Sequence, residues 1–391
     1  MIGVSKLYLG QTEASDTLRY GWREGQRSGP SSHAARKPVV VWNVTSRCNL
    51  SCQHCYADAA GGRNEKELTA EEAGDLIDDL ADFGCPVLLF SGGEPLTRPD
   101  LADLVHRAVS RGMRAVISTN GTLMTPERAA ELKAAGASYA GVSLDGLKET
   151  HDRFRNRPGA FEQALEGIRA CHAASLHVGL RLTLTRLNAG ELDGIFDLLV
   201  RERVPRVCFY HLVYTGRGSA IRGLDLSHEE TRRAVDHIID RARDAHENGI
   251  RLEVLTVDNH CDGPYLYLRM RREGDPRADE VLDLLRANGG NASGSGIGCV
   301  GWDGSVFPDQ FWRNHPLGNV REQPFSRIWS DRRNIWLAWL RDRRAFLDPP
   351  CPACRFFDAC GGNFRARAEA AGGHAWAVDP ACYLTEEERR E

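Results

Sequence analysis

Three closely spaced cysteines near the start of the chain carry the first chemical signal. Cys48, Cys52 and Cys55 form a C-x3-C-x2-C pattern in the segment TSRCNLSCQHCYAD. Three thiolates in so short a loop can surround one corner of an iron–sulfur cubane. A structural zinc site takes four ligands, and His54 could complete one here. Because no fourth cysteine is nearby, we expect a cluster with one iron open to a further ligand.

A second group of cysteines lies near the end of the chain. Cys351, Cys354 and Cys360 are spaced C-x2-C-x5-C, and Cys382 follows after 21 more residues. Four thiolates with no missing partner predict a closed site, which is either a 4Fe–4S cluster or a structural zinc. Cys299 stands outside both groups and is either a packing thiol or a further group near the second site.

The elements that must position these groups follow a repeating pattern. Short apolar runs that predict buried strands alternate with amphipathic stretches that predict helices. The predicted strands cover residues 39–44, 87–90, 115–119, 139–144, 178–184 and 206–213. Strand–helix units in series form parallel sheets. The expected fold class is therefore α/β, with a partial (β/α)6 barrel over residues 38–250 and functional groups at the C-terminal ends of its strands.

Polar residues follow several of these strands. The first cysteine group comes directly after the first strand, and SGGEP, which contains Gly92, Gly93 and Glu94, ends the second. Asn120 in STNG and the pair Ser143 and Asp145 in VSLDG end two more. These positions are typical of turns and helix caps, but they also place the side chains at the mouth of the predicted barrel.

The regular pattern ends near residue 250. Residues 1–37 read as a polar leader, and residues 251–298 as a helical linker that closes in a glycine-rich hinge at 288–298. The segment 299–391 is rich in loops and contains the second cysteine group. A small loop-rich domain of this kind needs an additional stabilising group, such as a bound metal.

Composition excludes several classes of function. The chain of 391 residues has a formal net charge of -4, which argues against a partner such as nucleic acid. No apolar run reaches the roughly 18 residues of a membrane span, and the beginning of the chain does not resemble a signal peptide. We therefore expect a cytoplasmic protein with no membrane partner, in which clustered cysteines bind metal rather than form disulfides.

The cysteine loop, followed at once by Tyr56, resembles the signature of the radical S-adenosylmethionine (SAM) superfamily. The resemblance implies a 4Fe–4S cluster on the three cysteines and reductive cleavage of SAM to a 5′-deoxyadenosyl radical. It also implies that the GGE motif contacts the amino group of SAM and that strand-end residues approach its ribose. The cofactor-binding residues implied are Tyr56, Gly92, Gly93, Glu94, Asn120, Ser143, Asp145 and Arg181, with Thr183 as a further candidate.

The second cysteine group resembles the SPASM/twitch-like domains of the same superfamily. The full SPASM pattern has seven cysteines and two auxiliary clusters. Phe364 occupies the position after Cys360 where the pattern has a further cysteine. Asp309 occupies the cysteine position of a G-x4-C element that begins at Gly304. The resemblance therefore implies a single auxiliary 4Fe–4S cluster on Cys351, Cys354, Cys360 and Cys382, and an external electron donor such as flavodoxin or ferredoxin.

Longer stretches resemble the radical SAM enzymes that trim sirohaem-derived tetrapyrroles, of the AhbC (12,18-didecarboxysirohaem deacetylase) and NirJ types. They include KPVVVWNVTSRCNLSCQHCY, LTVDNHCDGPYLYLRM and GNASGSGIGCVGWDG. The beginning of the chain and Cys299 favour the deacetylase type of haem biosynthesis. At position 261 a small residue is expected and the chain has Cys261, which also fits a paralogue recruited to another small molecule. A peptide-modifying SPASM enzyme is a further alternative, disfavoured because residues 1–37 are too short for a peptide-docking domain.

The tetrapyrrole resemblance implies a flat apolar substrate with several carboxylates. Aromatic and charged residues near the late strand ends and in the tail could stack on it or pair with it. These are Tyr210, His211, Tyr214, Arg217, His260, Trp302, Phe311 and Trp312. His260 or His211 could ligate the tetrapyrrole iron. The candidate catalytic residues are His260, Cys261, Tyr210 and His211.

Overall fold

The computed structural model describes residues 1–21, 37–59 and 66–390. Within them the framework is one open sheet of eleven strands in the order β1-β8-β7-β6-β5-β4-β3-β2-β9-β10-β11. The strands are β1 (Ile2–Gly3), β2 (Val39–Asn43), β3 (Val87–Ser91), β4 (Arg114–Thr119), β5 (Tyr139–Ser143), β6 (Val178–Leu184), β7 (Arg206–His211), β8 (Glu253–Val257), β9 (Ile297–Val300), β10 (Ser305–Phe307) and β11 (Gly318–Asn319).

The six predicted strands are all present as β2 to β7. They lie side by side in chain order, and each pairs in parallel with the next. Their residues are buried almost without interruption, as in β2 and β5, which is expected of parallel strands covered on both faces. The predicted α/β fold with a partial barrel is therefore confirmed.

The sheet continues beyond residues 38–250 at both ends. β8 pairs in parallel with β7, and β1 then pairs antiparallel with β8, with Ile2 opposite Thr256. At the other edge β9 pairs in parallel with β2, with Val41 opposite Cys299. The boundary predicted at residue 250 therefore lies inside the sheet, because the short strand β8 belongs to the same framework.

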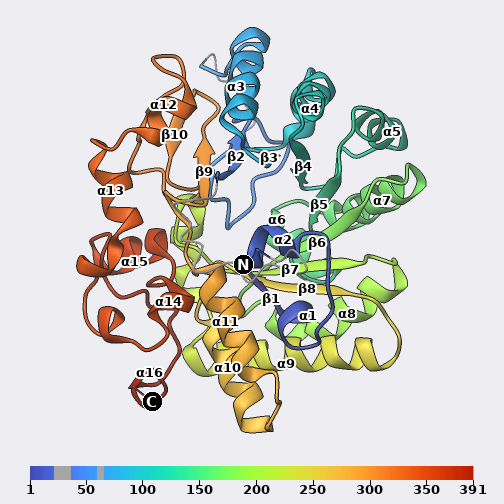
Figure 1. The fold of residues 1–391 in the computed structure, drawn as a ribbon. Helices are drawn as coiled ribbons and strands as arrows, with labels where there is room; N and C mark the ends of the chain where they lie inside the picture. Colours follow the sequence, from blue (N-terminus) through green and yellow to red (C-terminus); the bar gives the residue numbers. More distant parts are fainter. Residues whose placement is uncertain (22–36, 60–65, 391) are drawn as a thin grey trace.

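Helices flank the strands, and Figure 1 shows them around the outside of the curved sheet. The longer ones are α3 (Ala70–Phe83), α4 (Leu101–Ser110), α5 (Pro126–Ala134), α6 (Lys148–Arg155), α7 (Ala160–Ala173), α8 (Leu192–Arg201), α9 (His228–Glu247), α10 (Asp262–Glu273) and α11 (Ala278–Asn288). Local sequence explains where they start. At α3, Thr69 accepts from the Glu72 backbone while the Glu72 side chain accepts from the Thr69 backbone, a complete capping box.

The first 21 residues are part of the folded core. They form β1 and the short helices α1 (Val4–Leu7) and α2 (Asp16–Tyr20), and Ile2 and Leu7 are fully buried. The backbone N–H of Gly3 donates to the Tyr20 hydroxyl at 2.9 Å. The polar leader predicted over residues 1–37 is thus wrong for its first part, whereas residues 22–36 lie outside the described structure.

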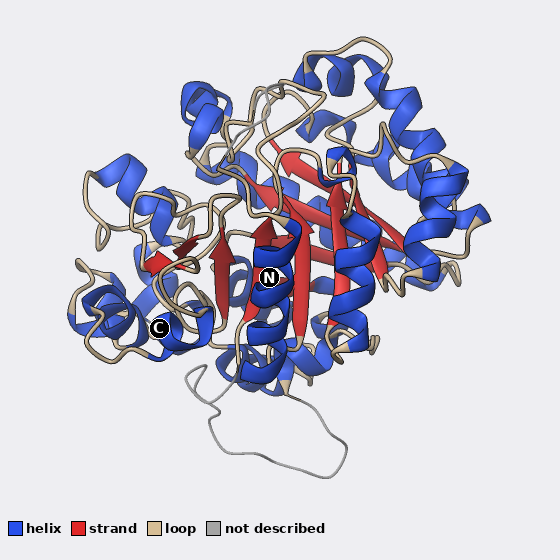
Figure 2. Cartoon of the chain, turned by 90° about the horizontal axis from the view of Figure 1, so that it is seen from above, coloured by secondary structure: helices blue, strands red, loops and turns tan. Residues whose placement is uncertain are grey.

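The tail packs against the barrel through short elements. These are α12 (Phe325–Ser330), α13 (Ile335–Arg341), α14 (Phe357–Cys360), α15 (Arg365–Gly372) and α16 (Glu386–Arg390). The buried Arg367 pairs with Asp379 at 2.8 Å and also donates to the carbonyls of Leu212 and Asp258, which follow β7 and β8. Figure 2 shows these loop-rich elements at one side of the sheet.

Among the described helices, none combines the length and the apolar composition that crossing a bilayer requires.

Candidate active site

The loop after β3 holds the three-cysteine loop, which follows β2, in place. The Gly93 N–H donates to the Thr45 carbonyl at 2.8 Å, and the Glu94 N–H donates to the Arg47 carbonyl at 2.7 Å. A Cβ on Gly93 would lie 2.1 Å from the Arg47 oxygen. At Gly92, where φ is +132°, a Cβ would lie 2.5 Å from the Thr45 oxygen. Only glycine permits such close contact, so both glycines are needed by the loop that carries the cysteines.

Hydrogen-bond donors point at two of the three thiols. The Leu50 N–H donates to the sulfur of Cys48, and the Arg155 guanidinium donates to that of Cys52, each at 3.4 Å. The Asn120 amide lies 4.0 Å from the Cys48 sulfur. Burial raises the pKa of the Cys48 thiol to about 12, so a nearby positive centre is needed to hold it as a thiolate. Three such thiols on one loop fit an iron–sulfur cluster.

Glu94 lies beside this loop but is turned into the protein. Its carboxylate accepts hydrogen bonds from the Thr119 hydroxyl and the Asn120 N–H, both at 2.7 Å, and from the Leu96 N–H at 3.1 Å. Burial raises the pKa of this carboxyl group. In this structure its side chain braces the loops after β3 and β4, and the predicted contact with the amino group of SAM stays a prediction.

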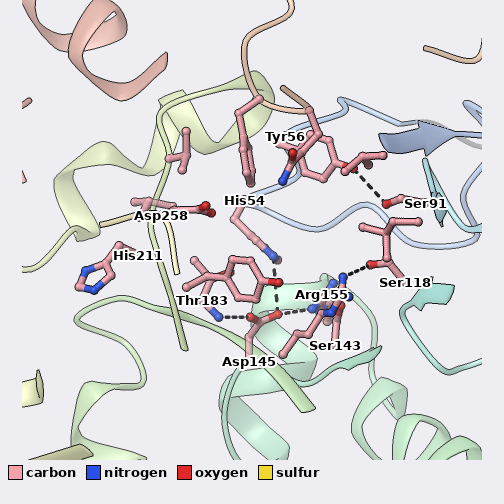
Figure 3. Close-up of a pocket in the computed structure, with 18 residues that line it drawn as sticks. His54, Tyr56, Ser91, Ser118, Ser143, Asp145, Arg155, Thr183, His211 and Asp258 are labelled. Atoms are coloured by element: carbon pink, nitrogen blue, oxygen red, sulfur yellow. Dashed lines mark hydrogen bonds and ion pairs between the residues drawn. The ribbon is translucent and has the colours of Figure 1, made fainter. Parts of the chain in front are cut away.

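A cavity of about 140 Å³ opens next to the cysteine loop, at the C-terminal ends of the strands (Figure 3). Four of the predicted cofactor-binding residues line it: Tyr56, Ser143, Asp145 and Arg181, together with Thr183. The other four, Gly92, Gly93, Glu94 and Asn120, hold the cysteine loop. The structure therefore brings all eight predicted residues to one end of the barrel, in two layers.

A buried ion pair forms one wall of the cavity. Asp145 pairs with Arg155 of α6, and the Thr183 N–H donates to the other Asp145 oxygen at 2.7 Å. Burial opposes ionisation of Asp145, but Arg155, His54, His151 and the Thr183 N–H together outweigh it, and the pKa of the carboxyl group stays below its usual value. His54 lies 3.7 Å from Asp145 and stacks on Phe154, and burial lowers the pKa of His54 to about 4.

Arg155 was missed by the sequence analysis. It connects the cavity to the cysteine loop, because its guanidinium contacts both Asp145 and Cys52. The only available signal was its place in the helix after VSLDG, which resembles any exposed arginine in a polar helix. On the other walls, the Arg181 guanidinium donates to the Ser118 hydroxyl at 2.6 Å, and the Tyr56 hydroxyl donates to Asn43 at 2.9 Å.

A second cavity of about 610 Å³ adjoins the first and extends toward the N-terminal ends of the strands. The two cavities share lining residues, among them Arg181, Tyr210 and Asp258. Asp258 follows β8 with a φ of +65°, which is uncommon for a residue other than glycine. Burial raises the pKa of its carboxyl group to about 7. Figure 3 shows this carboxyl group directed toward the cavity.

The residues predicted to contact a tetrapyrrole divide into two groups. Tyr210, His211 and Phe311 line the first cavity, and His260 lines the second. The remaining four have other partners and line neither cavity: the Tyr214 hydroxyl donates to Asp225, Arg217 donates to Cys52 and Asp58, Arg313 lies over the Trp302 ring, and Trp312 donates to Glu369.

The candidate catalytic residues are also separated. The His211 ring is engaged by buried Asp262 at 2.9 Å, and Figure 3 shows it at the edge of the cavity. The His260 N–H donates to Asn363 of the tail at 2.6 Å. Cys261 is fully buried outside both cavities, and its thiol lies 3.0 Å from the Asn259 side-chain oxygen. Tyr210 alone lines both cavities among these four candidates.

The four cysteines of the tail line one small cavity. Cys360 ends α14, where the Asn291 N–H donates to its carbonyl at 3.0 Å, and Gly290 is packed against the same backbone. A hydrogen bond from Cys261 lowers the pKa of Cys382 to about 6, although burial opposes this. Cys299 lies in β9, next to Asn43 and apart from these four. Four thiols around a common space fit a closed iron–sulfur site.

An aromatic chain joins the two cysteine sites. The Tyr56 and Phe311 ring centroids are 5.0 Å apart, and those of Phe311 and Phe364 are 5.5 Å apart. Asp309, like Phe364 a replacement for a SPASM cysteine, is buried and accepts from the Ser293 hydroxyl and the Phe311 N–H. Neither Asp309 nor Phe364 supplies a thiol, so one set of four thiols remains in the tail.

Comparison with known proteins agrees with this arrangement. Residues 42–199 match the model of the radical SAM superfamily, and residues 294–355 match SPASM, an iron–sulfur cluster-binding domain. Solved structures of the same fold include anSMEcpe with bound AdoMet and the peptide Cp18Cys (TM-score 0.68, 18% identity, 88% of this chain and 94% of that chain). Another is Streptococcus suis SuiB bound to the precursor peptide SuiA (TM-score 0.71, 15% identity, 89% and 76%).

Relatives of much higher identity extend over nearly the whole chain. Fe-coproporphyrin III synthase of Methanosarcina barkeri is 55% identical over 99% of this chain and 98% of its own length. Pre-heme d1 synthase of Dinoroseobacter shibae is 43% identical (89% and 87%), and AdoMet-dependent heme synthase of M. barkeri is 33% identical (88% and 95%). The cofactors of the present chain are accordingly SAM, a 4Fe–4S cluster and an auxiliary iron–sulfur cluster. The chain belongs to the radical SAM superfamily, to its SPASM-bearing enzymes of haem biosynthesis.

Proposed function

We propose that the enzyme removes acetate side chains from a didecarboxysirohaem and so forms iron coproporphyrin III. The observation that carries the proposal is the 55% identity to Fe-coproporphyrin III synthase over 99% of the chain. The two adjoining cavities support it, because the second, at about 610 Å³, has the size of an ordinary ligand pocket (roughly 300–1,000 Å³) and adjoins the cavity beside the cysteine loop.

In this proposal the first cavity holds SAM. Cys48, Cys52 and Cys55 would bind the cluster that leaves one iron open, and the cluster with SAM supplies a 5′-deoxyadenosyl radical when both are bound. Tyr56, Ser143, Asp145 and Arg181 would contact SAM from the cavity wall. Gly92, Gly93, Glu94 and Asn120 would position the cluster loop and the amino-acid end of SAM.

The chain's own residues orient the substrate and keep water out. Asp145 and Arg155 neutralise each other in the wall, so the wall offers a fixed dipole instead of a free charge. Tyr210 and Phe311 provide apolar surface on which a flat ring can stack. Asp258, next to both cavities, is placed to hold or release a proton near the substrate.

The tail would supply an electron-transfer site. Cys351, Cys354, Cys360 and Cys382 would bind the auxiliary cluster with no open position, which suits exchange of an electron with the substrate. An external donor such as flavodoxin or ferredoxin would reduce the enzyme.

The direct test is turnover of a defined substrate. Purified protein with reconstituted clusters, a reductant and SAM should convert didecarboxysirohaem to iron coproporphyrin III, followed by absorption and mass spectrometry. SAM cleavage to 5′-deoxyadenosine should accompany the loss of acetate groups. Active SAM cleavage with no change in any sirohaem derivative would overturn the proposal and favour a recruited paralogue.

The 43% identity to pre-heme d1 synthase supports a second candidate, in which the enzyme acts on propionate side chains as in the NirJ type. The same assay separates the two, because loss of propionate-derived groups and loss of acetate groups give products of different mass. A product that has lost propionate-derived groups and kept its acetate groups would favour this second function.

A further inference from the structure

One end of the second cavity, called its floor below, is lined by positively charged arginine side chains. It is formed at the N-terminal ends of β4, β5 and β7, where Arg114, Tyr139 and Arg206 begin their strands, and Arg19 of the N-terminal segment closes it. This is the end of the barrel opposite the cysteine loop. Figure 1 shows the N-terminal segment lying across the middle of the ring of strands.

The charges on this floor are not balanced. Arg19 pairs with Asp16 at 2.7 Å and with Glu253 at 2.8 Å, and Arg206 shares the same Glu253 at 3.3 Å. Arg114 has no carboxylate within ion-pair distance among the described residues, and its bond is to the neutral Ser138 hydroxyl at 3.1 Å. Three guanidinium groups thus share two carboxylates. Within the protein, an uncompensated guanidinium is costly unless a ligand supplies the missing negative charge.

Further observations show that this charge faces the cavity. The Arg206 guanidinium stacks over the Tyr139 ring at 5.0 Å, and its Nε atom is buried with no hydrogen-bond partner among the described residues. Burial, and then the like charge of Arg206, lower the pKa of Arg114, so the two cations lie close enough to repel each other. The other acids of the lining, Asp258 and Asp309, form no ion pair with these arginines among the described residues. Asp309 is bonded to Ser293 and to backbone N–H groups.

We propose that Arg114 and Arg206 form a carboxylate-binding subsite for the substrate of this enzyme. The subsite rests on the proposed function, since a sirohaem-derived ring carries several carboxylates around an apolar centre. Carboxylates bound at the floor would direct the opposite edge of the ring toward the first cavity, next to Tyr210 and Asp258. Guanidinium groups suit this role because they bind carboxylates in two-pronged pairs. Binding here fixes which side chain of the ring meets the cofactor.

Binding of iron porphyrins to the full-length protein tests the subsite without turnover. The probes are iron coproporphyrin, a tetracarboxylate, and iron mesoporphyrin, a dicarboxylate, both titrated by their absorption. The wild type should prefer the tetracarboxylate. Arg114→Gln and Arg206→Gln should each weaken tetracarboxylate binding about tenfold or more, as expected for a lost charge-assisted bond. Arg169→Gln, which removes an exposed guanidinium paired with Glu202, is the matched control and should change nothing.

Arg114→Lys is the control for a merely structural effect: it keeps the charge but loses the two-pronged pair, so it should bind more tightly than Arg114→Gln and less tightly than the wild type. Equal binding of both probes, unaffected by the Gln variants, would overturn the subsite while leaving the proposed function intact. Failure of the wild type to bind any tetrapyrrole would count against both. Citrate serves as a free carboxylate: if it binds as tightly as iron coproporphyrin, with the same dependence on Arg114, the floor is a site for a free anion and the proposal is wrong.

Discussion

Asp258 is a carboxyl group whose surroundings favour its neutral form. Its Oδ2 atom is buried with no hydrogen-bond partner among the described residues. Burial is the main cause that raises its pKa to about 7; Asp309 adds to the effect, whereas the N-terminal amine, Arg367 and His211 oppose it. The folded protein therefore binds this proton more tightly than the unfolded chain, whose aspartates have a pKa of about 3.9.

The sign of the pH dependence follows from linkage. Stability due to this group is complete below about pH 4 and is lost as the pH rises through 7. Asp258→Asn, which stays neutral, should raise the free energy of unfolding at pH 8 by roughly 2–4 kcal/mol relative to the wild type. The gain should shrink steadily as the pH falls from 7 to 4, as measured by urea unfolding. A difference between the two proteins that does not change with pH would contradict this explanation.

Cys261 lies next to the tail cysteines without lining their common cavity. Its thiol contacts the Asn259 oxygen and hydrogen-bonds Cys382. We therefore expect Cys261→Ala to keep the full iron and sulfide content of both clusters, whereas Cys382→Ala should lose the auxiliary cluster. Iron and sulfide analysis of the two variants decides this. Loss of a cluster from Cys261→Ala would make Cys261 a ligand.

The sequence predicted which functional side chains lie at the strand ends, but it did not predict which side chains they bond to. Asp145 and Arg181 were predicted at the barrel mouth because a parallel strand carries its end residues there. Arg155 was not, since its role depends on the distance in space between α6 and the cysteine loop. Likewise Tyr214 and Arg217 were predicted to face the substrate, but their hydrogen bonds to Asp225 and Cys52 turn them elsewhere. Such partners are decided by tertiary packing, which a single sequence does not encode locally.

At the scale of elements, the turn after β3 and the cysteine loop depend on each other. Gly93→Ala would place a Cβ 2.1 Å from the backbone oxygen of Arg47, and backbone cannot move aside as a flexible side chain can. We expect this variant to lose the SAM-cleaving cluster and keep the auxiliary one, with about half the iron of the wild type. Gly190→Ala is the control, because its Cβ would meet nothing within 4 Å. Full iron content in both variants would show that the loop tolerates the displacement.

The strands of the sheet were predictable where they are long and apolar, and not where neighbours complete them. β8 was assigned to a linker because its run, EVLTV, is short and adjoins polar sequence. It is a strand because β7 and β1 pair with both of its edges. The segment 1–21 was predicted as a polar leader for a similar reason: its few apolar residues, such as Ile2 and Leu7, are buried only by distant elements.

At the scale of the whole molecule, barrel and tail share one framework but have separate metal sites. β9 extends the barrel sheet into the tail, and Arg367 ties the tail to the ends of β7 and β8. Between the two cysteine sites lie side chains such as Phe311 and Phe364, which bind no metal. Each site should therefore assemble its own cluster.

Paired substitutions test this independence. Cys48→Ala should abolish SAM cleavage and leave about four irons per chain, whereas Cys354→Ala should leave the same number of irons and retain SAM cleavage without product formation. The reason is that each four-iron cluster draws its thiolates from one loop system, and the backbone bonds that hold the first loop come from the β3 turn, from Phe154 and from Arg217, all within the barrel. Iron analysis, electron paramagnetic resonance of the reduced proteins and detection of 5′-deoxyadenosine give the three readouts. If either substitution removed both clusters, the division of the ligands into two sites would be wrong, and the tail would have to act as part of the barrel's own metal site.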